Sequence, residues 1–419
     1  MRGLDAIRII GGRPLRGSIT VQGSKNAALP MMAAALLHEG VTVLHNCPRI
    51  ADVFYMEEIL RELGADTFWS GHSLHLDCRQ ICHACVKQDY TNKMRSSVIL
   101  LGALLGRKKQ GTIGYPGGCV IGQRPVDLHL QVLRGLGARI QESEEKICAD
   151  AKQMHGGCFV FPRKSVGATE QGMLAAVAIP EETQLLNCAC EPEILWLERL
   201  LNAMGADVRG ARDGRIRIRG GRRLRDCEFW VPPDRIVAGT YLCASAITRG
   251  VITLCNPPGE EMDAFLEVYQ KMGGQYKFIG GKLVADSRRA FKPVNFVETA
   301  EYPGFPTDLQ SPLMAVLTAA HGKSHIRENI FEDRFKAAYE LRKMGAGIEL
   351  SGRDAWIQGG SLRGNSVEAQ ELRGGAALVL AGLAAEGETI VRGASYIERG
   401  YETICEDLES LGGRIERYR

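Results

Sequence analysis

A short motif recurs six times along the chain at intervals of about 70 residues. Each copy places Leu or Met directly before a glycine near the end of a helical pattern, as in RELGAD from Arg61 and NAMGAD from Asn202. Glycine is favoured just past a helix C-terminus because it adopts the left-handed conformation easily. Alternating stretches such as SLHLDC, RIRIRGG and AWIQGG follow, and these predict two short strands joined by a turn. The repeat therefore indicates one supersecondary unit per copy.

A more uniformly apolar helix precedes each of these motifs. Two of the copies read NAALPMMAAALLHEG and LRGGAALVLAGLAAEG. A helix that is apolar all round is buried on most sides. A strand-like run follows each copy, such as VTVLHN or VITLCN. The unit that the residues indicate is helix, strand, helix, strand, strand.

The sixth copy lacks its last strand, because only RIERYR follows the final glycine pair. The N-terminal AIRIIGG has the missing pattern, so we expect the two ends of the chain to pair. Three repeats would form one domain over residues 23–230, and three more would form a second domain from residues 1–22 and 231–419. Pro232-Pro233 and the segment from Val21 to Gly23 would be the strands of a hinge, which favours ligand binding and closure between two lobes.

Composition excludes several classes of protein. The 419 residues include 52 basic and 49 acidic ones, and the net charge of +3 gives no sign of a nucleic-acid surface. The locally basic patch from Arg215 to Arg225 is interpreted as a solvated hairpin. No apolar signal core opens the chain, and no apolar span approaches the length of about 18 residues that a membrane helix needs. We therefore expect a cytoplasmic protein without membrane contact or an obligate protein partner.

The thirteen cysteines are scattered, which fits reduced thiols. The cluster of Cys78, Cys82, His83 and Cys85 contains one CxxC, but no second CxxC or HxxxH follows at finger spacing. This zinc signal is weak, and the alternation in SLHLDC favours a strand instead. We expect neither a metal nor a cofactor.

The loop YPGGCVIGQRPVDLHL combines several chemical groups within residues 115–130. Its Pro-Gly-Gly turn precedes the thiol of Cys119, and Arg124 and Pro125 precede a helix that begins near Asp127. A thiol beside a guanidinium and a helix N-terminus can act as an acid or a nucleophile. The alternative is a surface turn with an inert cysteine.

Basic residues stand where three of the buried helices begin: Lys25 in GSKNAALP, Arg95 in KMRSS and Arg373 in ELRGG. Helix N-termini attract anions, so these positions favour a phosphate or carboxylate, although Lys25 alone fits an exposed cap equally well. Asp308 lies in the rigid stretch YPGFPTDLQ and is either a base or a helix cap. Arg399 lies at another helix entry, in IERGYE.

Together, YPGGCVIGQRPVDLHL, GSKNAALP, GFPTDLQ and IERGYE resemble the enolpyruvyl transferase family, and within it the UDP-N-acetylglucosamine 1-carboxyvinyltransferases. The resemblance covers the whole chain. It implies an α/β (α+β) fold of two inverse α/β barrel domains, each of three βαβαββ repeats. It also implies transfer of the enolpyruvyl group of phosphoenolpyruvate to the 3-hydroxyl of UDP-N-acetylglucosamine, with release of phosphate, by addition and elimination through a tetrahedral ketal. This is the first committed step of peptidoglycan synthesis.

The resemblance also implies roles for individual residues. Cys119 protonates the methylene carbon and is the point of fosfomycin attachment, and Asp308 takes the proton of the attacking hydroxyl. Lys25, Arg124 and Arg399 hold the phosphate and carboxylate, and the charges of Arg95 and Arg373 assist them. The remaining expected substrate-binding residues are Asn26, Pro125, Val126, Asp127, Leu128, Ser165, Val166, Gly167 and Ile330.

Two positions depart from the family pattern. Ala51, in PRIADV, stands where some members have lysine, so an anion contact is lost there unless Arg49 replaces it. Glu371 stands where other members have aspartate.

Two rival functions remain. Enolpyruvylshikimate-phosphate synthase has the same fold and donor, but its GSKS…NR signature is absent, because NAALPMM follows GSK here. A weakly active paralogue that regulates by binding is the other rival, and the intact set of Lys25, Cys119, Asp308 and Arg399 argues against it.

Overall fold

The computed structural model describes residues 5–116, 126–289 and 292–418. The chain forms two compact units. It passes from one unit to the other between Gln22 and Gly23 and again between Pro232 and Pro233. Among the described residues, unit 1 contains those up to Gln22 and from Pro233 onward, and unit 2 contains those from Gly23 to Pro232. Each unit has its own hydrophobic core.

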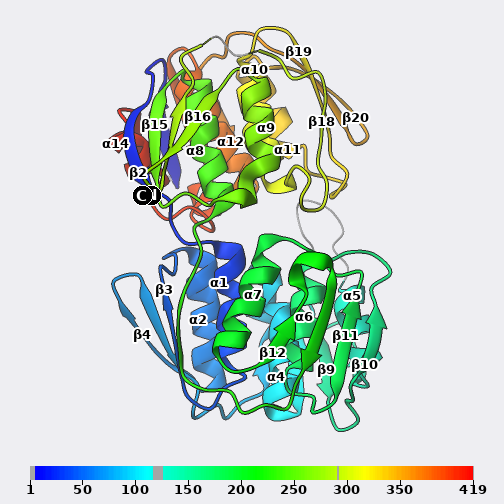
Figure 1. The fold of residues 1–419 in the computed structure, drawn as a ribbon. Helices are drawn as coiled ribbons and strands as arrows, with labels where there is room; N and C mark the ends of the chain where they lie inside the picture. The colour runs from blue at the N-terminus through cyan, green and yellow to red at the C-terminus, as the bar shows by residue number, and fades with distance from the viewer. Residues whose placement is uncertain (1–4, 117–125, 290–291, 419) are drawn as a thin grey trace. The chain divides into compact units, whose positions relative to one another are not determined.

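Six largely buried helices lie at the centres of the two units (Figure 1). Every residue of the helix Arg235–Ile247, for example, is buried, which is what an apolar sequence on all helix faces requires. The six are α1 (Lys25–Ala35), α4 (Leu100–Lys108), α6 (Val166–Ala176), α8 (Arg235–Ile247), α10 (Gln310–Thr318) and α12 (Leu372–Ala384). In each unit the three buried helices pack against one another, as predicted for uniformly apolar helices.

A second set of six helices has one buried and one exposed face. These are α2 (Ala51–Leu63), α5 (Asp127–Gly135), α7 (Pro192–Ala203), α9 (Asp263–Lys271), α11 (Lys336–Lys343) and α14 (Ile404–Ser410). The predicted terminating glycine follows each of them, with φ between 85° and 110° at all six positions. The backbone there is left-handed, so the glycine motif of the sequence is confirmed as a helix-ending device.

Six four-stranded sheets share one topology, in which a parallel strand joins a three-stranded antiparallel arrangement. The sheet orders are β14-β3-β5-β4, β6-β7-β9-β8 and β10-β11-β13-β12 in unit 2, and β2-β15-β17-β16, β18-β19-β21-β20 and β22-β23-β1-β24 in unit 1. The predicted α/β fold of two domains with three βαβαββ repeats each is confirmed. The unit predicted from the residues alone omitted the strand before each buried helix. Two of these strands, β6 and β18, are only two residues long, which leaves little pattern to detect.

The strand bounds follow the repeats. In unit 2 they are β3 (Val41–His45), β4 (Asp66–Ser70), β5 (Ser73–Asp77), β6 (Cys85–Val86), β7 (Gln110–Gly114), β8 (Arg139–Glu142), β9 (Lys146–Asp150), β10 (Gly157–Val160), β11 (Glu182–Leu186), β12 (Asp207–Arg209), β13 (Arg215–Arg219) and β14 (Cys227–Trp230). In unit 1 they are β1 (Ala6–Ile10), β2 (Arg16–Thr20), β15 (Val251–Cys255), β16 (Gln275–Ile279), β17 (Lys282–Asp286), β18 (Val297–Glu298), β19 (Lys323–Arg327), β20 (Gly347–Ser351), β21 (Asp354–Gln358), β22 (Ser366–Glu368), β23 (Glu388–Arg392) and β24 (Arg414–Tyr418).

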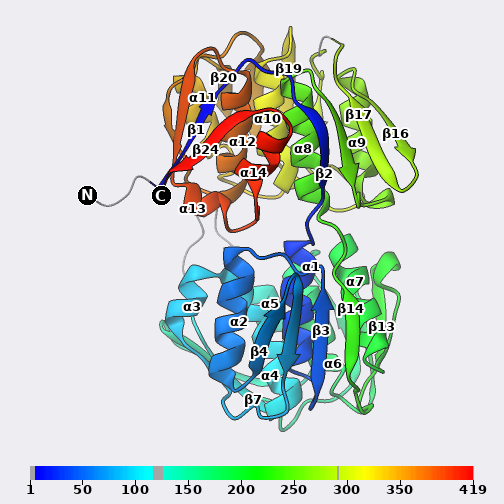
Figure 2. The same cartoon turned by 90° about the vertical axis from the view of Figure 1, so that its left-hand side faces the viewer.

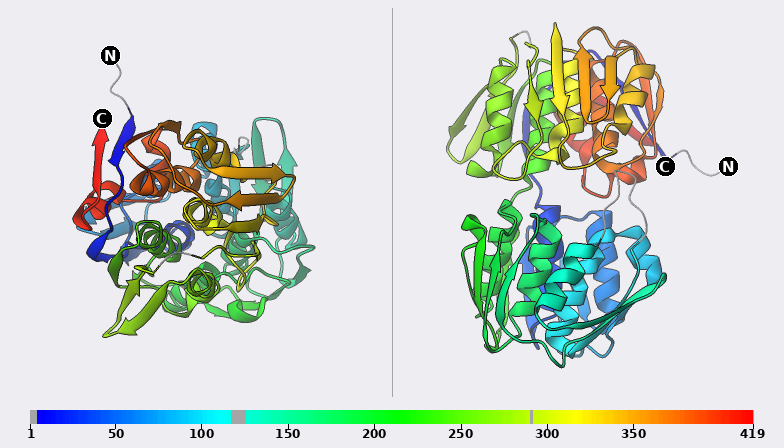
Figure 3. Two further views of the ribbon diagram at one scale, coloured as in Figure 1. Left: turned by 90° about the horizontal axis from the view of Figure 1, so that it is seen from above. Right: turned by 90° about the vertical axis from the view of Figure 1, so that its right-hand side faces the viewer.

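The two units exchange one strand each. Strand β2 precedes α1 of unit 2 in the chain but pairs with β15 in unit 1, whereas β14 precedes α8 of unit 1 but pairs with β3 in unit 2 (Figure 2). Backbone hydrogen bonds from Ser24 to Pro232 (2.7 Å) and from Asp234 to Gln22 (2.9 Å) join the two crossing segments. Strand β1 lies between β23 and β24, so the first and last strands of the chain are neighbours (Figure 3).

The terminating glycines give a test of the repeat. Gly345 has φ of +92°, and an added Cβ would meet nothing closer than the Ser361 carbonyl at 3.7 Å. We expect Gly345→Ala to lower the free energy of unfolding by about 1–2 kcal/mol, because an L-residue is strained in this conformation. Thermal unfolding should show this loss, while the control Gly360→Ala, which has open space and no positive φ, should unfold like the wild type. Equal midpoints for the two variants would contradict this account.

Candidate active site

Lys25 is fixed at the start of the first buried helix. Ser24 caps α1 by accepting a hydrogen bond from the Ala27 amide at 3.3 Å. The Lys25 ammonium lies 3.3 Å from Asp52, whose side chain is only 3% exposed. Asn26 follows on the first turn and is half-buried. A held ammonium beside a helix N-terminus is suited to bind an anion.

Arg95 begins the short helix η1 (Arg95–Ile99), which leads into α4, and its side chain is half-buried. It therefore stands at the start of the second buried helix, as the repeat predicted. Arg49, by contrast, lies over the Trp69 ring at 4.9 Å and donates to the Gly71 carbonyl at 3.1 Å. These contacts position Arg49 near Ala51, and its replacement of the missing lysine stays a prediction.

Cys119, Arg124 and Pro125 lie outside the described residues. Within the described residues the same motif resumes at Val126, the N-cap residue of α5, and Asp127 lies 3.3 Å from Arg163. Leu128 is buried in the core of unit 2, so its side chain packs there.

The N-termini of α5 and α6 lie together in unit 2. Ser165 caps α6 by accepting from the Ala168 amide at 3.4 Å, and Val166 begins the helix. His129 of α5 bonds Gln171 of α6 at 2.8 Å. A Cβ on Gly167 would lie 2.9 Å from the His129 ring, so glycine permits the approach of the two helices. The structure thus brings together the predicted segments at residues 126–128 and 165–167.

Asp308 of unit 1 is held by two arginines. It lies in the short helix η4 (Thr307–Leu309), directly before α10. Its Oδ1 accepts from Arg334 at 2.7 Å and its Oδ2 from Arg373 at 3.2 Å. The side chains of Arg334 and Arg373 are 3% and 2% exposed, whereas that of Asp308 is 27% exposed. Pro306 is the residue that caps η4, so Asp308 presents a carboxylate rather than a helix cap.

Arg373 is enclosed at the start of α12. Glu371 caps that helix by accepting hydrogen bonds from the amides of Arg373 (2.8 Å) and Gly374. The glutamate that stands here in place of the family's aspartate therefore has a structural role as a helix cap. The guanidinium lies over the Tyr401 ring at 5.4 Å. Burial alone lowers the pKa of Arg373, but Tyr401, Asp308 and Asp234 outweigh it and raise the pKa above the ordinary arginine value. Arg373 is therefore a permanent cation facing Asp308.

Arg399 and Ile330 lie on two loops of unit 1. Arg399 is half-buried and follows α13 (Ala394–Ile397). Gln22 fixes the next residues by donating to the Gly400 carbonyl at 3.3 Å and accepting from the Glu402 amide at 2.8 Å. The Ile330 amide donates to the buried carboxylate of Glu328 at 2.8 Å. Arg334, Glu328, Tyr401 and Gln22 were not predicted, because no local pattern marks residues that act through distant contacts.

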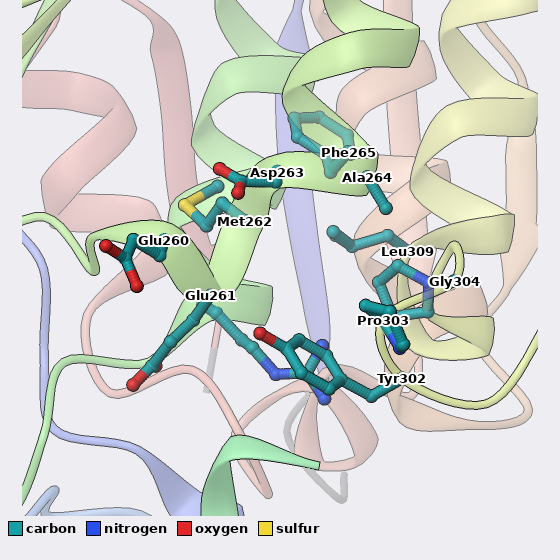
Figure 4. A pocket seen from close by; sticks show the side chains of 12 residues that line it. Glu260, Glu261, Met262, Asp263, Ala264, Phe265, Tyr302, Pro303, Gly304 and Leu309 are labelled. Carbon is teal, nitrogen blue, oxygen red and sulfur yellow. The ribbon is translucent and has the colours of Figure 1, made fainter. Parts of the chain in front are cut away.

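A hollow beside the Asp308 turn is lined by Arg235, the segment from Glu260 to Phe265, residues 302–304, Pro306 and Leu309 (Figure 4). Glu260, Glu261 and Asp263 contribute carboxylates to its wall. This wall disfavours a phosphate or carboxylate ligand. The anion-binding residues predicted from sequence are therefore distinct from this hollow.

Within the described ranges, no three His, Cys, Asp or Glu side chains gather as metal ligands would. Cys78 is buried, and burial raises its thiol pKa to about 12, while Cys82 and Cys85 are exposed. The predicted strand through SLHLDC is β5. In the same described part of the chain, no helix is long and apolar enough to cross a membrane.

Comparison with known proteins places this geometry in a family. The model for EPSP synthase (3-phosphoshikimate 1-carboxyvinyltransferase) matches residues 9–408, so the chain belongs to this family of 1-carboxyvinyl (enolpyruvyl) transferases. Its fold is similar to that of the enolpyruvyl transferase NikO from Streptomyces tendae, with a TM-score of 0.89, 23% identity and full coverage of both chains. An EPSP synthase from Acinetobacter baumannii has a TM-score of 0.75 at 21% identity, covering 98% of this chain and 99% of that one.

The relatives found by sequence indicate which branch of the family the chain resembles most. The chain is 44% identical to a protein of Caldanaerobacter subterraneus named UDP-N-acetylglucosamine 1-carboxyvinyltransferase 2, over 99% of this chain and 100% of that one. It is 42% identical to the UDP-N-acetylglucosamine 1-carboxyvinyltransferase of Azorhizobium caulinodans, over 99% of both chains. Similarity at this level over the full length favours the UDP-sugar branch over the shikimate branch.

The helix that carries Ser165 to Gly167 also contains a buried carboxyl group. Burial raises the pKa of Glu170 well above the ordinary glutamate value, and Glu193 and Glu191 raise it further. A carboxyl group with a raised pKa in the folded state stabilises the fold at low pH, and this contribution is lost as pH rises from about 4.5 toward the raised value.

We expect Glu170→Gln, which mimics the protonated acid, to unfold at a higher temperature than the wild type at about pH 8 and at the same temperature at about pH 4. Calorimetry at both pH values measures the difference. An equal loss of stability at the two pH values would show that the variant only disturbs packing.

Proposed function

We propose that the protein transfers the enolpyruvyl group of phosphoenolpyruvate to the 3-hydroxyl of UDP-N-acetylglucosamine and releases phosphate. The observation that carries the proposal is the partly exposed carboxylate of Asp308, held between Arg334 and Arg373. The relatives that the chain resembles over its full length are named for this activity. The product would enter peptidoglycan synthesis, and hence cell-wall biogenesis, cell shape and cell division, in the cytoplasm.

Phosphoenolpyruvate carries a phosphate and a carboxylate close together, so its binding requires several cations. Lys25 is the first, because Asp52 holds its ammonium at the α1 N-terminus. We assign Arg95, Arg124 and Arg399 to the same anionic groups. Arg373 differs from these, because its buried guanidinium contacts Asp308 and thereby contributes charge behind the base. Bidentate or paired cations of this kind orient a dianion strongly.

The reaction needs a base for the sugar hydroxyl and an acid that donates a proton to the methylene carbon. Two guanidinium groups hold the Asp308 carboxylate in place, and part of that side chain stays exposed. Asp308 would accept the proton of the sugar hydroxyl as that oxygen attacks the enol carbon. The thiol of Cys119 would donate the proton to the methylene carbon. In the elimination, the Cys119 thiolate would take a proton back from the methyl group, which restores the vinyl double bond. The C–O bond to phosphate breaks in the same step, and the phosphate leaves with the proton that Asp308 accepted.

The nucleotide sugar is assigned to the paired helix starts of unit 2. The backbone amides at the beginnings of α5 and α6, beside Asp127 and Ser165, can meet a diphosphate. Asn26 and Ile330 are also assigned to substrate binding. Because Leu128 and Gly167 serve packing of the helices, their contribution to binding is indirect.

The experiment that tests the proposed function measures phosphate release from phosphoenolpyruvate with each acceptor in turn. We expect release with UDP-N-acetylglucosamine and none above background with shikimate 3-phosphate, because the shikimate signature is absent. Release with shikimate 3-phosphate alone would contradict the proposal in favour of the shikimate branch. Release with neither, from a folded protein, would favour a regulatory paralogue. Loss of the activity on treatment with fosfomycin would indicate that the activity depends on a reactive thiol.

A further inference from the structure

A buried carboxylate gathers three segments of unit 1 around the Asp308 turn. Glu328 follows β19 and is 1% exposed. Its Oε1 accepts from the Thr299 hydroxyl at 2.9 Å and from the amides of Ile330 (2.8 Å) and Phe331 (3.1 Å). Its Oε2 accepts from the Thr307 hydroxyl at 2.9 Å. Four donors thus converge on one side chain that belongs to none of the predicted functional positions.

This arrangement gives both oxygens of the Glu328 carboxylate hydrogen-bond donors. Both oxygens of Glu328 act only as acceptors, and all four partners are hydroxyl or amide donors. Burial makes each of these hydrogen bonds costly to break, because an unpaired donor would lose its hydration without compensation. The carboxylate therefore holds the end of β18, the loop of Ile330 and the start of η4 in one mutual arrangement.

The Thr307 hydroxyl is the link to Asp308. Helix η4 is three residues long and has no side-chain hydrogen bond from its capping residue. The bond from Thr307 to Glu328 anchors its first residue, and Asp308 comes next in the chain. On the other side of the turn, Arg334 and Arg373 hold the carboxylate of Asp308. The orientation of Asp308 thus depends on both its arginines and the Glu328 anchor.

We propose that Glu328, acting through Thr307, is a positioning residue for Asp308 and for the Ile330 loop. This inference rests on the proposed function, in which Asp308 accepts the proton of the acceptor hydroxyl. Misplacement of a reacting group by about 1 Å lowers a rate by about 10²-fold. Glu328 touches no substrate in this scheme, so its effect is on the turnover step more than on substrate affinity.

The test uses Thr307→Val, because Glu328→Ala leaves four buried donors unpaired and threatens folding. Valine keeps the shape of threonine and removes only the hydroxyl. Thr307→Ser restores the hydroxyl, and Thr389→Val removes a buried hydroxyl that has no hydrogen-bond partner among the described residues of the same unit. Each variant is compared with the wild type in phosphate release, in thermal unfolding and in the pH profile of kcat.

We expect Thr307→Val to lower kcat by about tenfold or more, with KM for UDP-N-acetylglucosamine changed by less than about threefold. The acidic limb of the kcat profile should move to higher pH, because a displaced Asp308 loses part of its stabilisation by the arginines. Thr307→Ser should recover most of the rate, and Thr389→Val should match the wild type. An unchanged kcat and pH profile in Thr307→Val would overturn the inference.

A crystal structure of Thr307→Val separates this inference from the proposed function. The variant should show the Asp308 carboxylate displaced from Arg334 or Arg373 by about 1 Å or more, whatever reaction the protein catalyses. An Asp308 that keeps both contacts would refute the positioning role. Failure of the wild type to release phosphate would instead refute the proposed function. The positioning role of Glu328 would then be decided by the crystal structure of Thr307→Val alone.

Discussion

The burial of six helices that are apolar on every face is the constraint on which this structure depends. Such a helix has no side that can face water, so it needs protein on all sides. Each unit meets this need by packing three buried helices together and surrounding them with sheets and amphipathic helices. The glycine at the end of each amphipathic helix then turns the chain into the strand pair that completes the cover.

The same constraint decides where polar chemistry can stand. A buried helix exposes polar backbone only at its ends, and its N-terminus has free amides and a positive dipole. Lys25, Ser165, Asp308 and Arg373 all lie at or directly before the beginnings of buried helices. The repeated fold thus collects cations and helix dipoles at equivalent positions, which is what a reaction of two anionic substrates requires.

The sequence predicts the repeated elements well because they depend on local patterns. Apolar helices, terminating glycines and alternating strands follow from neighbours a few residues apart. The pairing of β2 with β15 and of β14 with β3 is different, since neither strand carries a local signal that selects its partner strand, although the predicted domain bounds already separated these two strands from the helices that follow them. The environment of Asp308 was also hidden, because Arg334 and Arg373 lie 26 and 65 residues away in sequence. Lys25, Arg95 and Arg373 lie where buried helices begin, as predicted, whereas Arg334, which also holds Asp308, had to come from the structure.

The central claim is that Asp308, held in place by two buried arginines, takes the proton of the acceptor hydroxyl. The most direct measurement is kcat of Asp308→Asn, with the affinity for UDP-N-acetylglucosamine determined separately by calorimetry on the folded variant. The account predicts a loss in kcat of about 10²-fold or more, as for removal of a general base, with affinity within about tenfold of the wild type. A variant that turns over at the wild-type rate would contradict it.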